Sequence, residues 1–326
     1  MSTSTTGRKA IRSLLGNRGS ALMLTLMVIT TLTGLTLAFH EESGVELDLA
    51  AYSRDEYKGY EAARTASQIA LALLDEDEDK EMDSLQEPWS QLPQVPLPPS
   101  FLEDTTVFGK IMDESGKFNV NNLITKDGKI DEGKAAHLSR LLSALGLDDS
   151  IIPALMDWID KDDEERLDGA EDFYYQNLDP PYRSANRSFV TPGQILMVKG
   201  LAEIAQFGGE DKKNLLDYLT IYSEGKININ TAPKEVLESL HQELDESIAE
   251  SIIAFREETD FISPGDMKQV PEVGDALYNA IKDMITVKSN AFTIEASGSC
   301  QESTSLIKAV ALREKGKTRF IYWRVF

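Results

Sequence analysis

The feature that most constrains this chain is a run of twenty uncharged residues near its start, Ser20 to Phe39. In a helix, twenty residues at about 1.5 Å each span about 30 Å, the hydrocarbon thickness of a bilayer. Four basic and no acidic residues precede the run, whereas Glu41, Glu42 and further acids follow it. The positive-inside rule therefore predicts one transmembrane helix with a cytoplasmic N-terminus and an exported remainder.

A secretory signal peptide is the main alternative interpretation of this run. Such a peptide has a shorter apolar core that ends in a small-x-small cleavage site, which Leu37-Ala38-Phe39-His40 matches poorly. We therefore expect a retained membrane helix. Apolar residues at helical spacing continue as far as Leu73, and no proline occurs between Met1 and Leu74. The sequence predicts a single helix from Ser20 to about Leu74, apolar in its first half and amphipathic in its second.

Composition limits what the remaining residues can do. About 290 residues follow the membrane run, enough for two domains with real cores. The net charge is −22, and the only basic clusters are the residues that precede the membrane run and a modest group near the C-terminus. This argues against phosphate-mediated nucleic-acid binding, which needs clustered cations. Cys300 is the only cysteine, so no internal disulfide forms. His40, His137 and His241 are scattered and no phosphate-cradling loop occurs, so we predict that the chain is not an enzyme.

Further along the chain, the signals change from strand to helix and back. The acidic run Asp75 to Asp83 is interpreted as a solvated helix end, and the proline-rich stretch Pro88 to Ser100 as an extended crossing segment. Strands are predicted at 105–112 and 117–120, helices from about 126 to 286, and three strands at 291–300, 305–315 and 318–326. The order indicates an α+β protein with a helical domain inserted.

The leader gives the first resemblance to a known family. Its basic stretch ends in Gly19 directly before the apolar run, which resembles the N-termini of type IV pilins and of the pseudopilins of type II secretion. In those families a prepilin peptidase cuts after the glycine and methylates the new N-terminus, here Ser20. Most members carry a glutamate at the fifth mature position, where this chain has Leu24. The K-type minor pseudopilins typically lack that glutamate.

The densest group of charges lies between Asp157 and Asp172, where nine acidic residues accompany only two basic ones. Such crowding costs folding free energy unless the acids face solvent or share a cation. Oxygen ligands in a glycine-containing loop suit calcium, but Glu165 stands where an EF-hand needs its turn glycine. The residue types alone favour neither interpretation, a calcium site or a solvated acidic loop, over the other.

The segment around these acids resembles the helical domain of the K-type minor pseudopilins. It contains a Trp-Ile-Asp helix end, then Gly-Ala-Glu-Asp, a tyrosine pair and Leu-Asp-Pro-Pro-Tyr, in that order between 157 and 183. The resemblance implies bound calcium in this region. The calcium ligands that the resemblance implies are Asp160, Asp162, Asp168, Glu171 and Asp172.

The resemblance also implies a fold and its domains. We expect an α+β pseudopilin fold, in which a long transmembrane and amphipathic helix packs on a small antiparallel sheet, with an inserted all-α domain of helix-hairpin-helix (SAM-like) units. The expected divisions are a leader at 1–19, a membrane segment at 20–39, a pseudopilin domain at 20–125 and 287–326, and the inserted helical domain at 126–286.

Residues 229–285 resemble two helix-hairpin-helix units of DNA-uptake and repair proteins. Such a hairpin holds a phosphate on backbone N–H groups at a helix N-terminus. Here the first hairpin, 241–246, has three acids and no glycine, and the second, 271–275, is also acidic. Because carboxylates repel phosphate, we expect no nucleic-acid binding. A membrane-anchored periplasmic module that binds DNA or another polyanion stays the alternative function.

The function implied by the resemblance is that of a minor pseudopilin in protein export across the outer membrane. Such a protein is an inner-membrane precursor that prepilin peptidase cuts and that then joins minor pseudopilins I and J at the tip of a pseudopilus built from the major pseudopilin. It is expected to initiate assembly and to cap the filament. The first subunit of a filament has no subunit above it with which a glutamate at the fifth mature position could pair. Such a buried glutamate would stay unpaired at a cost of several kcal/mol, and Leu24 avoids this cost.

Overall fold

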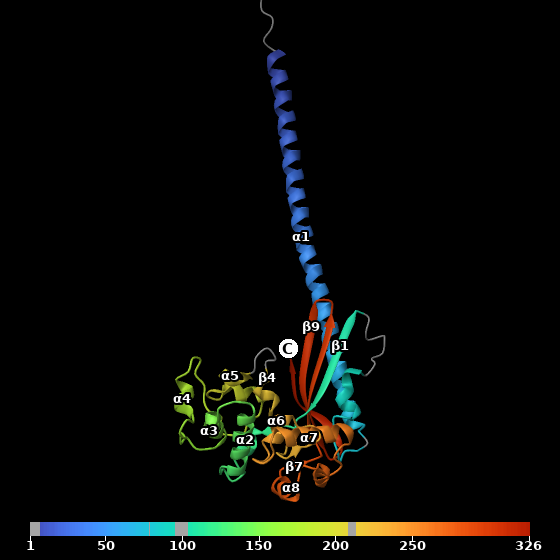
Figure 1. Cartoon of the computed structure of the whole chain (residues 1–326). Coiled ribbons are helices and arrows are strands. Elements are labelled where there is room, and N and C mark those ends of the chain that lie inside the picture. Colours follow the sequence, from blue (N-terminus) through green and yellow to red (C-terminus); the bar gives the residue numbers. More distant parts are fainter. Residues whose placement is uncertain (1–6, 78, 95–103, 208–212) are drawn as a thin grey trace, which may run out of the picture.

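The structure of the chain is a computed structural model, which describes residues 7–77, 79–94, 104–207 and 213–326. Parts of two predicted segments, residues 1–6 of the leader and 95–100 of the proline-rich stretch, lie outside this range. Figure 1 shows a long helix that projects from a folded head. This helix, α1 (Gly7–Asp75), has 69 residues without a break. The predicted single helix is confirmed.

After the basic residues that end at Arg18, α1 continues with an apolar stretch that is free of the head. An 18-residue window in it has a mean hydropathy of 2.0 and none of it is buried, so α1 is long and apolar enough to cross a membrane. The first buried side chain in the described part of α1 is Asp55. From there a row of small residues at helical spacing faces the head, including Ala63, Ala66 and Ala70. The helix thus combines an exposed apolar stretch, compatible with a single-pass membrane anchor, with a second half that packs on the head.

The head contains a four-stranded antiparallel sheet against which α1 packs (Figure 1). Its order is β1 (Thr105–Asp113), β8 (Ala291–Cys300), β9 (Ser303–Glu314) and β10 (Lys317–Val325). Small apolar residues let helix and sheet approach closely. A Cβ atom added to Gly298 of β8 would overlap the backbone of α1 at Gly59 and Ala63. The four-stranded sheet packed on α1 confirms the predicted pseudopilin arrangement.

The chain between β1 and β8 forms one large hydrophobic cluster, which we call the helical unit (residues 118–287). Together with η1 (Pro88–Gln94), which precedes β1, its elements complete the fold. In chain order they are β2 (Phe118–Asn119), η3 (Val120–Leu123), α2 (Glu132–Ala144), η4 (Asp149–Ile151), α3 (Ile152–Ile159), α4 (Asp172–Gln176), η5 (Pro192–Met197), α5 (Leu201–Ile204), β3 (Gln206–Phe207), β4 (Lys213–Asn214), η6 (Leu215–Asp217), β5 (Leu219–Thr220), β6 (Ile227–Asn228), α6 (Lys234–Glu238), α7 (Glu246–Glu258), η7 (Pro264–Gln269), α8 (Asp275–Ile281) and β7 (Ile285–Thr286).

The helical unit also contains three short strand pairs, of which the sequence predicted only the strand β2, within 117–120. Residues 215–222 were expected to be helical, but they form a 3-10 turn and then β5. The reason is tertiary, because β5 pairs in parallel with β2 near the start of the unit. Similarly, β6 pairs in parallel with β7 at its end. These pairings draw the two ends of the unit together.

The helical unit joins the sheet at two adjacent points. Asp113, the last residue of β1, is the Cα partner of Phe292 in β8. The Asp113 carboxylate is buried and accepts hydrogen bonds from Thr231 Oγ1 (2.6 Å) and Ser289 Oγ (2.5 Å). The neighbouring Glu114 is buried and pairs with Lys117 at 2.8 Å. The junction is therefore polar but satisfied, which fixes the unit relative to the sheet.

Candidate functional site

An aromatic cluster brings together the two ends of the acidic loop 160–171. Trp158, in the last turn of α3, is buried, and its ring meets Tyr175 of α4 edge-on with centroids 5.1 Å apart. On its other side it stacks on Phe189 at 6.1 Å. The apolar sequence IPALMDWI forms α3 because seven of its eight residues are buried. The loop therefore starts and ends on a rigid support.

The loop is wrapped around one buried carboxylate, that of Asp157. Its oxygens accept hydrogen bonds from the N–H groups of Arg166 (3.2 Å) and Ala170 (2.9 Å), and they form an ion pair with the Arg166 guanidinium. Gly169 lies against the same carboxylate, where an added Cβ atom would overlap it. Asp157 thus shapes the loop, and the glycine is needed for close approach.

Three of the five predicted ligands come together in this loop. Asp160, Asp162 and Glu171 each offer an oxygen, and these oxygens lie within 4.8 Å of one another. Asp160 and Glu171 are buried, whereas Asp162 is exposed. Asp160 Oδ2 pairs with Arg166, but Asp160 Oδ1 and Glu171 Oε1 have no hydrogen-bond partner within the described residues.

Electrostatics marks the two buried members of this group, Asp160 and Glu171. Burial raises the pKa of Asp160, which its contact with Arg166 lowers in part. Burial, helped by the nearby charges of Asp157 and Asp160, raises the pKa of Glu171 to about 7. A hard cation would relieve both effects, because it is coordinated by carboxylate oxygens and supplies the missing positive charge. The donor set therefore fits calcium in ligand type.

The other two predicted ligands lie beside the group. Asp172 starts α4, and its Oδ1 accepts hydrogen bonds from Ser184 N (2.8 Å) and Ser184 Oγ (3.0 Å). Ser184 Oγ also lies 3.3 Å from Glu171 Oε2, so Asp172 is next to the cluster. Asp168 adopts a left-handed conformation with φ of 66°, and its carbonyl oxygen lies 3.5 Å from Lys199 Nζ. Their role as ligands stays a prediction.

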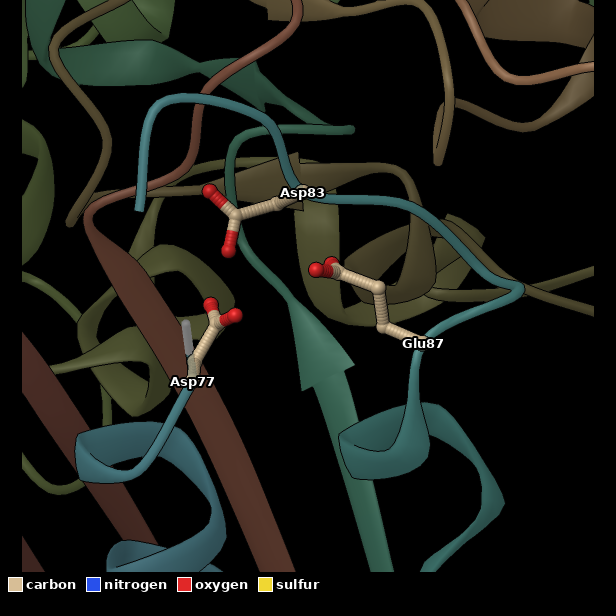
Figure 2. Close-up of side chains that lie close together, drawn as sticks. All are labelled: Asp77, Asp83 and Glu87. Carbon is tan, nitrogen blue, oxygen red and sulfur yellow. The ribbon is translucent and has the colours of Figure 1, made fainter. Parts of the chain in front are cut away.

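The structure brings together a second carboxylate cluster that sequence reasoning missed (Figure 2). It comprises Asp77, Asp83 and Glu87, and the interpretation of this region as a solvated helix end is wrong for Asp83, which is fully buried. The cause is Arg313 of β9, itself buried, which pairs with Asp83 at 2.8 Å and Asp77 at 2.9 Å. Because these partners lie more than 200 residues apart in the chain, no local pattern indicates them.

This second cluster already contains its counter-charge. Burial raises the pKa of Asp83 to about 7 although Arg313 lowers it, and burial also raises the pKa of Glu87. Glu87 Oε2 accepts hydrogen bonds from Ser84 N and from Trp89 Nε1, each 2.8 Å long. The cluster ties the end of α1, the following loop and β9 together, so we assign it a structural role.

The remaining sequence-predicted positions lie elsewhere. Gly19, Ser20 and Leu24 are exposed residues of α1. At the first predicted hairpin, the Asp245 side chain accepts a hydrogen bond from Ile248 N (3.0 Å), so a carboxylate occupies the helix N-terminus where a phosphate would bind. Cys300 is buried against Asp55, far along the chain from the other groups considered.

The arrangement defines a pseudopilin, with an apolar helix that continues onto an antiparallel sheet and a large unit inserted between two adjacent strands. The models of two parts of one family, each described as "Type II secretion system (T2SS), protein K", match residues 116–224 and 227–288, together more than half of the chain. The chain belongs to the type II secretion system protein K family, whose members are minor pseudopilins.

Individual relatives agree with the family match. The chain is 29% identical to the type II secretion system protein K of Pseudomonas aeruginosa over 81% of its own length and 80% of the relative's. It is 25% identical to the protein K of Pectobacterium carotovorum over 85% and 87%. A chain in the crystal structure of the GspK-GspI-GspJ complex from enterotoxigenic Escherichia coli has the same fold, with a TM-score of 0.62, 18% identity, and coverage of 88% of this chain and 99% of that one.

Proposed function

We propose that this minor pseudopilin forms the tip of the pseudopilus together with minor pseudopilins I and J, and that it starts assembly and caps the filament. The observation that carries the proposal is the likeness in fold to a chain of a solved complex that contains K, I and J components. The major pseudopilin would follow below, and prepilin peptidase would act beforehand. The N-terminus would stay in the cytoplasm, with the head in the periplasm, because positive charges precede the span.

Two features of the chain support a position at the top of a filament. Leu24 stands at the fifth position after Gly19, and its apolar side chain is 65% exposed on α1, so it adds no charge to a surface that would enter a helical core. The helical unit adds a second body to one end of the sheet, opposite the free part of α1 (Figure 1). A unit of that size would block the addition of a subunit from above.

The adjacency of Asp113 and Phe292 makes the capping role testable, because residues 115–290 can be replaced by a two-residue Asn-Gly turn between β1 and β8. In cells that overproduce the major subunit, electron microscopy should then show longer or more numerous pseudopili. Leu24→Glu should leave unchanged or weaken the start of assembly, with Leu24→Ile as the matched control. Pseudopili of wild-type length and number in the deletion variant would contradict capping.

We also propose that Asp160, Asp162 and Glu171 bind calcium, with Asp168 and Asp172 as further ligands. The two buried, unpartnered carboxylate oxygens support this, because leaving such atoms unsatisfied is costly. The ion would join the end of α3 to the start of α4 and so rigidify the loop. No catalytic step is involved, and the expectation that the protein is not an enzyme stays a prediction.

The calcium proposal predicts a change in thermal stability. A ligand in hundredfold excess over its Kd stabilises a protein by about 2.7 kcal/mol, enough to raise the melting temperature by several degrees. Calcium, but not magnesium, should restore the stability that a chelator removes from the full chain in detergent. Asp160→Asn with Asp162→Asn should abolish the response, whereas Glu164→Gln with Glu165→Gln, exposed in the same loop, should keep it. A melting curve that chelator does not change would leave the solvated-loop interpretation.

A further inference from the structure

The C-terminal strand β10 is basic although the chain is strongly acidic. The last twelve residues, 315–326, contain Lys315, Lys317, Arg319 and Arg324 but no acidic side chain, whereas the whole chain has a net charge of −22. This is the modest basic cluster noted in the sequence. Neither the proposed metal site nor the junction between sheet and helical unit accounts for it.

This strand lies at the edge of the sheet. The order β1-β8-β9-β10 leaves one side of β10 without a neighbouring strand among the described residues, and no residue of β10 is buried. Phe326 exchanges backbone hydrogen bonds with Leu306 of β9. Because bonded and non-bonded residues alternate in antiparallel pairs, Trp323 and Val325 direct their N–H and C=O groups away from β9. The edge therefore offers backbone donors and acceptors.

The cations follow one face of the edge. Arg319 and Arg324 are opposite Leu312 and Lys308 of β9, on the sheet face away from α1, and alternation places Lys317 on the same face. Arg319 pairs with Glu314 at 3.1 Å. In contrast, Lys317 and Arg324 form no ion pair within the described residues, and the Arg324 guanidinium lies 4.6 Å from the Phe326 ring centroid. Positive charge is thus left available along the edge.

We propose that β10 binds an extended acidic segment of another polypeptide, which adds to the sheet as a fifth strand. Its backbone would pair with the outward groups at Trp323 and Val325. Carboxylates at alternate positions would pair across strands with Lys317, Arg319 and Arg324. Main-chain bonds supply affinity in strand addition, and alternate side chains supply specificity. The proposal depends neither on a position at the tip nor on calcium.

The competing explanation is that the charges only protect the edge. Lysine and arginine side chains and β-bulges keep exposed edges from aggregating, and β10 has a register shift between Phe320 and Tyr322. The two explanations differ in one measurable respect. A docking site binds an acidic strand in a way that needs the strand's backbone N–H groups, whereas an edge that is only protected from aggregation binds no strand.

The test measures fluorescence anisotropy of labelled nine-residue peptides with the full chain in uncharged detergent. One peptide alternates glutamate with valine, a second has lysine for glutamate, and a third has proline for valine. We expect the first to bind, and the other two to bind at least tenfold more weakly, because the lysines are repelled and the prolines lack N–H groups. Slowed amide exchange at Trp323 and Val325 should accompany binding.

Two charge variants complete the experiment. Arg319→Glu with Arg324→Glu should weaken binding of the acidic peptide about tenfold or more, since two attractive cross-strand pairs become repulsive. Lys126→Glu with Lys129→Glu makes the same change in net charge on an exposed part of the helical unit and should leave binding intact. Equal binding of the proline peptide, equal weakening by the control variant, or no binding at millimolar peptide would each overturn the proposal.

Discussion

Replacing Arg313 by methionine tests whether the cluster in Figure 2 holds α1 to the sheet. The change keeps an unbranched apolar stem but removes the cation that contacts Asp77, Asp83 and the carbonyl oxygen of Leu74. Breaking a buried ion pair on one side costs about 3–5 kcal/mol, because it leaves an uncompensated buried charge. At about 2–4 °C per kcal/mol for a unit of this size, the melting temperature should fall by roughly 10 °C at pH 8.

The pH dependence of this variant gives a second test. Burial raises the pKa of Asp83 to about 7 even with Arg313 present, so removal of the arginine should raise that pKa further. For an acid whose folded-state pKa is raised, stability is fully present below its unfolded pKa near 4 and is lost as pH rises through the folded value. The deficit of Arg313→Met should therefore shrink between pH 8 and pH 5.5.

Circular dichroism melts of the full chain in detergent measure both effects. Adding Asp83→Asn to Arg313→Met should recover part of the loss, because no buried charge then remains on Asp83. Arg319→Met is the matched control, since Arg319 is exposed and should change stability by less than about 0.5 kcal/mol. The reasoning is refuted if Arg313→Met melts like the wild type at pH 8, or if its deficit grows as the pH is lowered.

Three further predictions concern other parts of the chain. Burial lowers the pKa of His137 to about 3, so the free energy of unfolding should fall by about 1.4 kcal/mol per pH unit as the pH drops below 6.5. Between pH 7.5 and pH 5, His137→Gln should therefore lose about 2 kcal/mol less stability than the wild type. Melting profiles that stay parallel over this pH range would contradict the prediction. Gly169→Ala should destabilise by about 1–3 kcal/mol in thermal melts because its Cβ overlaps Asp157, whereas Gly193→Ala has open space and should not. Mass spectrometry of the membrane form should find a methylated Ser20 as the first residue, and an intact Met1 in cells with active prepilin peptidase would disprove processing.

Features that depend on local patterns could be predicted from the sequence. The absence of proline and the continued helical spacing up to Leu73 indicated α1, and β8 was predicted over its observed range, 291–300. The acidic loop was recognisable because nine acids in sixteen residues need an explanation whatever the fold. Periodicity and composition report what neighbouring residues do together, so such features are accessible without a structure.

Features that depend on distant residues could not be predicted in this way. Asp83 reads as one more acid in an acidic run, and only its contact with Arg313 explains why it is buried. The strand β5 forms because Phe118 and Asn119 lie beside it, although its sequence is compatible with a helix. Within the acidic loop, the choice of Asp160, Asp162 and Glu171 over their neighbours depends on which carboxylates the turn around Asp157 brings close to one another.

The adjacency of β1 and β8 has a consequence for the order of folding. The two strands can pair only after Phe292, the partner of Asp113, has been synthesised 179 residues later. Closing a flexible loop of that length costs about 4–5 kcal/mol of chain entropy beyond a constant. If the helical unit collapses first, its parallel pairs β2–β5 and β6–β7 already hold its two ends near each other, and most of that entropy is lost before the sheet forms. The helical unit would then act as an internal folding template, with the sheet and its contact to α1 completed last.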